Sequence, residues 1–152
     1  MQRYVLQTTL PQLTNVFGLP PTSMQSLKPN FNTAPGHIMP IIKLQENAFN
    51  VESAVWDPKR STITIDEVLK KPNASLIENP CIVPVSGFYI WKQTVKDALP
   101  FYVRIHSQPI LGIAAFVSQQ EDFRIHFTVL TKDANVLVQP IEPMMPAILE
   151  EK

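Results

Sequence analysis

The sequence has little cysteine, little glycine, no net charge and no long apolar run, and each shortage excludes a class of protein. Its single cysteine, Cys81, cannot form an internal disulfide and excludes a cysteine-rich zinc site. Its four glycines lie far apart, at positions 18, 36, 87 and 112, so no glycine-rich loop exists to bind nucleotide phosphates. Thirteen basic and thirteen acidic residues cancel, which leaves no overall field to attract DNA or an anionic membrane.

The apolar residues are also too dispersed for a membrane segment. No stretch of about 18 consecutive apolar residues occurs, and the first residues, MQRYVLQTTLPQL, lack an apolar run of signal-peptide length. A single cysteine suits a reducing compartment. We therefore expect a soluble, cytoplasmic protein with no membrane partner and no nucleotide cofactor.

What the sequence does contain is enough apolar material for one core. It has 152 residues, of which 45% are hydrophobic and 17% charged. A domain of this size buries roughly 68–70% of the surface of its unfolded chain, so we expect a single domain over residues 1–152. Fifteen prolines against four glycines favour short, proline-bounded strands over long helices.

The pattern of apolar and turn residues predicts a series of short strands and two or three short helices. Strands are expected at residues 2–6, 38–44, 48–56, 62–65, 81–85, 88–91, 101–105, 110–116, 123–130 and 147–149. Helices are expected at residues 10–17, 66–71 and 131–138, and the proline-rich segment 20–35 is expected to form a packed loop. Because the strands cluster and do not alternate with helices, the fold class is α+β with a curved, barrel-like mixed or antiparallel sheet.

The residue types that carry metal or thiol chemistry are scattered. Cys81 lies in an apolar run and is expected in the core. In the alternating segment 123–130, His126 is expected to face outward; His106 is expected in a turn. His37 follows the Pro35-Gly36 turn and is the histidine expected to face a cleft. Because the histidines lie on separate elements, we expect no metal site and no cofactor.

Three segments resemble the SOS-response-associated peptidase (SRAP) family, the abasic-site processing proteins. The family motif N-x-A-P-G is present from Asn32 to Gly36. Its C-x-[VI]-P-x-x-G-[FW]-[FY]-E-W run is present from Cys81 to Trp91, with Ile90 in place of Glu. Its I-H-x-R-M-P motif matches Ile141 to Pro146, with Glu142 for His and Met144 for Arg. The resemblance covers nearly the whole chain and implies the SRAP fold.

The same resemblance places substitutions at four positions of the family's reaction site. Gln2 stands where the family has its nucleophilic Cys, Ile63 where it has Asn, Ile90 where it has Glu, and Glu142 where it has His. In the family, removal of the first Met exposes the Cys, whose thiol and α-amine capture the aldehyde of an abasic site. The resemblance therefore implies four vestigial positions and no catalytic residues for this reaction.

Two hypotheses remain open. The first is a non-catalytic binding module for a protein partner or for single-stranded or abasic DNA, with cleft candidates at Arg3, Asn32, Pro35, His37, Trp56 and Glu67. The second is an enzyme that acts on abasic DNA through the α-amine of Met1, which would form a Schiff base, with Glu142 as the acid–base partner.

Overall fold

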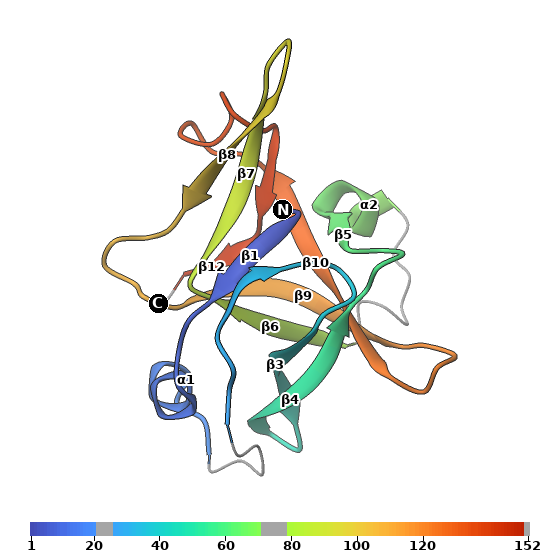
Figure 1. Cartoon of the computed structure of the whole chain (residues 1–152). Helices are drawn as coiled ribbons and strands as arrows, with labels where there is room; N and C mark the ends of the chain where they lie inside the picture. Colours follow the sequence, from blue (N-terminus) through green and yellow to red (C-terminus); the bar gives the residue numbers. More distant parts are fainter. Residues whose placement is uncertain (21–25, 71–78, 151–152) are drawn as a thin grey trace.

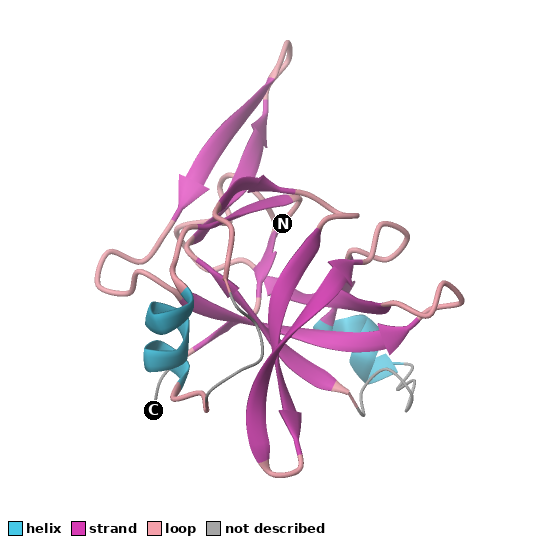
Figure 2. Ribbon diagram, turned by 60° about the horizontal axis from the view of Figure 1, so that its bottom comes forward, coloured by secondary structure: helices cyan, strands magenta, loops and turns pink. Residues whose placement is uncertain are grey.

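The computed structural model describes residues 1–20, 26–70 and 79–150, which form two sheets and two short helices (Figure 1). The helices are α1 (Leu10–Phe17) and α2 (Ile65–Lys70), and they lie on opposite sides of the strands (Figure 2). The strands of these ranges are β1 (Arg3–Leu6), β2 (Asn30–Thr33), β3 (Ile38–Gln45), β4 (Ala48–Trp56), β5 (Thr62–Thr64), β6 (Pro80–Val85), β7 (Gly87–Gln93), β8 (Ala98–Val103), β9 (Leu111–Gln119), β10 (Ile125–Asp133), β11 (Met144–Pro146) and β12 (Ile148–Leu149).

Local sequence signals account for the first helix and for the tightest hairpin. Thr9 caps α1, since its side chain accepts the N–H of Gln12, whose own side chain bonds back to the Thr9 N–H. Gly18 ends the helix with φ 61°. In the turn between β3 and β4, Glu46 and Asn47 have φ values of 48° and 64°, as a two-residue hairpin turn requires.

The smaller sheet has the strand order β2-β1-β7-β8. Strand β1 pairs antiparallel with β7, with Arg3 opposite Tyr89 and Tyr4 opposite Phe88. The hairpin of β7 and β8 extends away from the rest of the molecule (Figure 1). This sheet therefore carries the N-terminus beside β7 and presents β8 as an exposed edge.

The larger sheet curls so that its pairings return on themselves. Its order is β11-β10-β4-β3-β6-β9-β12, and β10 pairs in addition with β9 and β5. The β4–β10 and β5–β10 pairs are parallel, whereas the other pairs are antiparallel. This curled mixed sheet with few helices confirms the predicted α+β, barrel-like class, although it is not a strict barrel.

The main core lies between the two sheets. Its largest fully buried side chains are Trp56, Tyr4, Phe88 and Phe127. The Trp56 ring stacks on Phe127 at a centroid distance of 6.2 Å and lies 5.2 Å from the Tyr4 ring. Burial of rings of this size dominates the stability of a domain this small. Within the described ranges, no helix is long and apolar enough to cross a bilayer.

Three sequence-based expectations about elements are corrected by the structure. The expected helix at 131–138 is wrong, because β10 continues to Asp133 by pairing with β11 and turns follow it. The expected loop 20–35 contains β2, which pairs with β1; its residues 21–25 lie outside the described ranges, as does Lys71 at the expected end of α2. Phe123 is not a strand residue but an 86% exposed turn residue.

Candidate functional site

The first residue is built into the core. Met1 is only 7% exposed, and its side chain belongs to the main core cluster together with Ile90 and Tyr4. Its α-amine is buried too, and this burial lowers the pKa of the amine below its ordinary value, an effect that the nearby Glu142 carboxylate partly offsets. A larger fraction of the amine is therefore neutral near pH 7 than in an exposed N-terminus.

Glu142 connects the segment before β11 with β7. Its Oε1 accepts a hydrogen bond of 3.1 Å from the backbone N–H of Trp91. Its own N–H donates to the carbonyl of Val138 at 2.9 Å, which fixes the backbone at this position. The carboxylate therefore has a structural partner in β7 and also lies within electrostatic range of the Met1 amine.

The other positions that the family resemblance singled out divide between the surface and the core. Gln2 is exposed, and the β1–β7 register, with Arg3 opposite Tyr89, places it beside Ile90. Ile90 is 1% exposed and Ile63 is 3% exposed. Glu142 bonds to Trp91, the residue after Ile90 on β7, whereas Ile63 lies on β5 and pairs with β10 in the larger sheet.

Of the cleft candidates, Arg3, Asn32, Pro35 and His37 lie near β1 and β2. Arg3 bonds the carbonyl of Gln2, and the backbone N–H of Asn32 donates to Asn30 Oδ1 at 2.9 Å. His37 is exposed, and its Nδ1 accepts the N–H of Ala34 at 3.2 Å, within the turn that Pro35 begins. Gly36 in that turn has φ 95°, as predicted for a Pro-Gly turn. His37 is therefore exposed and stabilises its own turn.

The structure corrects the expected place of Trp56 in a cleft, and it gives Glu67 a local hydrogen-bond partner. Trp56 is 0% exposed, and its Nε1–H donates to the carbonyl of Ser61 at 2.9 Å. Both ring contacts described above are with core aromatics, so no ring face is open for a nucleic-acid base. Glu67 Oε2 accepts the N–H of Thr64 while Thr64 Oγ1 accepts the N–H of Glu67, which is a capping box for α2.

The only cysteine offers no nucleophile. Cys81 is 6% exposed, and burial raises the pKa of its thiol to about 12. Lys43 opposes this shift and Glu52 adds to it, but desolvation is the largest cause. In the described part of the chain, no group of three or more His, Cys, Asp or Glu side chains is placed to hold a metal ion.

A feature that sequence reasoning missed is an aromatic face on the projecting hairpin. The Tyr89 ring lies 6.1 Å from Trp91 and 5.2 Å from Tyr102, which is 44% exposed. A Cβ at Gly87 would come within 2.5 Å of the Tyr102 ring, so only glycine lets this ring lie across β7. The sequence did contain a signal for this aromatic face, because inward and outward residues alternate along β7 (Gly87–Gln93) and along β8. Phe88 and Ile90 point inward, so Tyr89 and Trp91 point outward.

The fold and the site together define a β-rich α+β domain whose N-terminal residue is part of the core. The chain belongs to the SRAP family (SOS response associated peptidase), whose model matches residues 2–152. The resemblance found in the sequence is thereby confirmed.

Solved structures share this fold at low sequence identity. A protein from Bacteroides thetaiotaomicron superimposes with a TM-score of 0.85 at 17% identity, covering 99% of this chain and 78% of that one. A protein from Bordetella bronchiseptica has a TM-score of 0.77 at 15% identity, with coverages of 99% and 84%. A phage-related protein from the same organism has a TM-score of 0.76 at 17% identity, with coverages of 98% and 77%. Comparison with curated proteins gives no match.

Proposed function

We propose that this SRAP-family chain is a non-catalytic binding module for single-stranded DNA or a protein partner, and that it has lost the family's thiol-based reaction with abasic sites. The observation that carries the proposal is the alternation of β7. On its inner face, Phe88 and Ile90 are 0% and 1% exposed, where the family resemblance places a catalytic carboxylate at residue 90. On its outer face, Tyr89 and Trp91 form the aromatic face with Tyr102.

The chemistry at the N-terminus supports the loss of the thiol reaction. Gln2 has no sulfur, and Met1, if retained, fills the core beside Ile90. The buried Cys81 thiol is neither terminal nor ionised near neutral pH, since its pKa is about 12. We therefore expect the protein to form no heat-stable thiazolidine cross-link with abasic single-stranded DNA.

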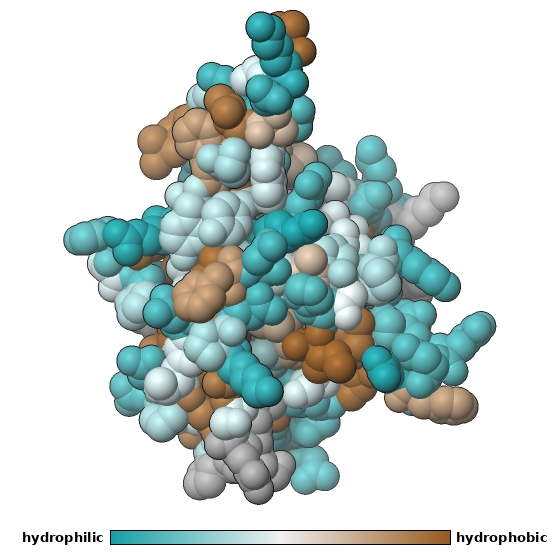
Figure 3. Space-filling model, in the orientation of Figure 1, coloured by the Kyte–Doolittle hydropathy of each residue, from teal (hydrophilic) through white to brown (hydrophobic). Residues whose placement is uncertain are grey.

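The aromatic face favours single-stranded DNA among the two partner classes. Aromatic side chains next to basic residues are the common elements of single-strand binding, because every base has a face that can stack. Arg3 lies opposite Tyr89 in the sheet register, which places this basic residue on the same face as the aromatic rings. Apolar atoms are also exposed on the projecting hairpin, as Figure 3 shows, and they belong to residues such as Leu99 and Phe101.

We expect Trp91→Ala to weaken binding of a fluorescein-labelled single-stranded oligonucleotide by about tenfold or more. Loss of one base–aromatic stacking contact has an effect of about 1–3 kcal/mol. Fluorescence anisotropy at fixed ionic strength measures the dissociation constants. Leu99→Ala is the matched control, because Leu99 pairs with Lys92 and so lies on the opposite face of the same hairpin.

Equal loss of affinity in both variants would show that the aromatic face does not bind bases. Absence of DNA binding by the unaltered protein would leave the protein-partner class, since the same exposed aromatic and apolar side chains suit a protein interface.

A second candidate function is favoured by one observation, the buried Met1 amine beside Glu142. A neutral α-amine can attack the aldehyde of an abasic site to give a carbinolamine, which loses water to form a Schiff base, with the carboxylate transferring the protons. The lowered pKa of this amine increases its neutral fraction at physiological pH. The reaction would require Met1 to move outward, because the residue is only 7% exposed.

For this candidate, we expect borohydride-dependent trapping of abasic single-stranded DNA at residue 1. The trapping rate should rise with pH, and the midpoint of the rise should lie below the ordinary amine pKa of 8.0. Peptide mass spectrometry locates the adduct. An N-terminally acetylated sample serves as the control, and trapping that survives acetylation would assign the adduct to a lysine.

A further inference from the structure

Strand β8 (Ala98–Val103) ends the smaller sheet, and among the described strands only β7 pairs with it. Its hairpin extends away from the rest of the molecule, so no other described element covers the outer side of β8 (Figure 1). The six residues ALPFYV carry no charge, and Leu99, Phe101 and Tyr102 are between 41% and 49% exposed. A short, uncharged and apolar edge strand is a template for pairing with another chain.

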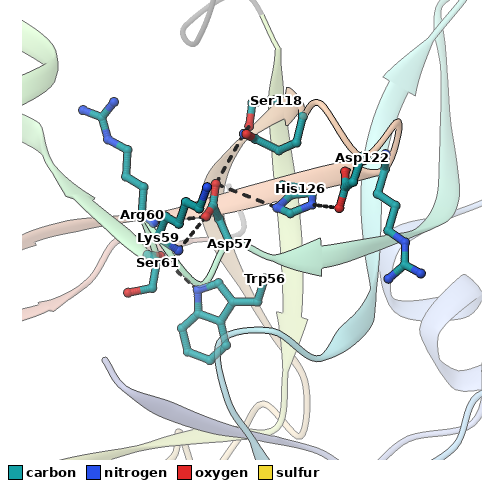
Figure 4. A network of polar contacts seen from close by, with 10 residues as sticks. Trp56, Asp57, Lys59, Arg60, Ser61, Ser118, Asp122 and His126 are labelled. Carbon is teal, nitrogen blue, oxygen red and sulfur yellow. Dashed lines mark hydrogen bonds and ion pairs between the residues drawn. The ribbon is translucent and has the colours of Figure 1, made fainter.

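The larger sheet protects its strands in a different way. It curls on itself, and the β4–β5 loop bonds β10 between the pairings of β10 with β4 and with β5. The N–H of Asp57 donates to the carbonyl of Phe127 at 2.9 Å, and the N–H of Val129 donates to that of Ser61 at 3.0 Å. Figure 4 shows this loop, with the Asp57 carboxylate beside the imidazole of His126. His126 was expected to face outward on its strand, but under this loop it is only 7% exposed.

The hairpin register determines where the backbone of Pro100 points. Along an antiparallel pair, residues that bond each other alternate with residues whose polar groups point apart. Thr94 donates to the carbonyl of Asp97 at 2.8 Å, so Trp91 and Pro100, three pairs further along, point apart. The N–H of Trp91 agrees, because it donates to Glu142 and not toward β8. The nitrogen and the carbonyl of Pro100 therefore face the open edge.

The open edge lacks a donor at its centre. Ala98 and Tyr102, two residues before and after Pro100, also direct their backbone groups outward. In the part of the chain that the structure describes, these outward N–H and carbonyl groups bond no other residue. Pro100 contributes only a carbonyl, because proline has no N–H. A proline at this position costs the hairpin no hydrogen bond and removes a donor only from the edge.

We propose that Pro100 prevents β8 from pairing with β8 of a second copy of this chain. A twofold axis at residue 100 would place Ala98 of one strand opposite Tyr102 of the other, and Pro100 opposite Pro100. Each of the two outer pairs would form two hydrogen bonds, but the central pair would form none. Each proline ring would also occupy the place of the hydrogen that the opposite carbonyl requires. This role does not depend on the proposed DNA binding.

The second copy is the occupant that this strand fits best, because the strand complements itself. The same register would place the exposed Leu99 opposite Phe101 of the other copy, so that each apolar side chain covers the other. No charge on either strand would oppose this contact. Only the missing central donors and the two rings then keep the strands apart.

The test is Pro100→Val, studied by sedimentation velocity over a range of protein concentrations. Valine keeps an apolar side chain and adds one N–H to each edge, so the dimer dissociation constant should fall by about tenfold or more. Ala98→Val is the matched control, because it adds apolar surface to the same edge without a new N–H, and it should behave as the unaltered protein. Equal association of both variants, or none in a folded Pro100→Val, would overturn the proposal. If Pro100→Val is insoluble, Pro100→Thr adds the same N–H with a polar side chain.

Amide hydrogen exchange measured by NMR locates the contact. The N–H groups of Ala98 and Tyr102 should exchange rapidly in the unaltered protein and at least about tenfold more slowly in the associated Pro100→Val. Unchanged exchange in an associated Pro100→Val would place the contact elsewhere and contradict the proposal. Protection of both amides in the unaltered protein, together with dimerisation, would show that Pro100 does not block the edge.

Pro100→Lys tests the twofold arrangement. Lysine also adds the N–H, but the axis at residue 100 would place two like charges directly opposite each other. This variant should therefore associate about tenfold more weakly than Pro100→Val, or remain monomeric. Equal association of the two variants would exclude a twofold pairing of β8 strands about this residue.

Discussion

We expect Ile90→Glu to lower the free energy of unfolding by about 3–5 kcal/mol, although this substitution restores the residue that the family motif has at position 90. Ile90 is 1% exposed within the main core, so the change removes a buried aliphatic side chain and buries a carboxyl group without a partner. Glu142, whose carboxylate accepts the N–H of the adjacent Trp91, would add repulsion. Urea unfolding monitored by circular dichroism measures the difference.

The pH dependence of this variant has a definite sign. Burial raises the pKa of the introduced carboxyl in the folded state above its unfolded value, so the folded state binds more protons. The destabilisation is therefore smallest at pH 4 and grows as the pH rises through the raised pKa. Tyr89→Glu, one residue away on the outer face, is the matched control and should cost no more than about 1.5 kcal/mol. If both variants lost equal stability, residue 90 would not occupy the apolar interior.

We expect that Gln2→Cys alone does not restore abasic-site cross-linking at the rate of an active family member. The cross-linking rate of this variant should be about 10²–10⁴-fold lower. Once Met1 is removed, the new thiol supplies the nucleophile, but Ile63 and Ile90 offer neither the Asn nor the Glu of the family. General acid–base assistance has this magnitude, equivalent to roughly 3–5 kcal/mol of activation free energy. Removal of Met1 also takes a 7% exposed side chain out of the core.

The measurement is denaturing electrophoresis of reactions with an abasic single-stranded oligonucleotide, with an active family member as the reference. The quadruple variant Gln2→Cys, Ile63→Asn, Ile90→Glu, Glu142→His should react faster than the single variant. It should also be less stable, because each unpaired polar group in an apolar site costs about 1–3 kcal/mol. Cross-linking by the single variant at the reference rate would show that the other three residues are dispensable.

The amino-acid sequence by itself determined the features that depend on neighbouring residues. Thr9 with Gln12 and Gly18 specified the ends of α1, and the Pro35-Gly36 pair specified its turn. The motifs from Asn32 to Gly36 and from Cys81 to Trp91 indicated the family and hence the fold. These signals are reliable because caps and turns form within a few residues of chain, where local backbone preferences decide the conformation.

Only the tertiary structure decided which faces are buried and which polar groups meet. Residues 131–133 extend β10 because β11 pairs with them, although the local sequence allowed a helix. His126 is buried because the Asp57 loop, almost 70 positions earlier in the chain, covers the outer face of β10. Trp56 lies in the core, and Glu142 meets Trp91 across 51 positions. Contacts between distant segments have no local signal, so strand pairing and burial, which form only in the folded chain, determined both candidate sites of this protein.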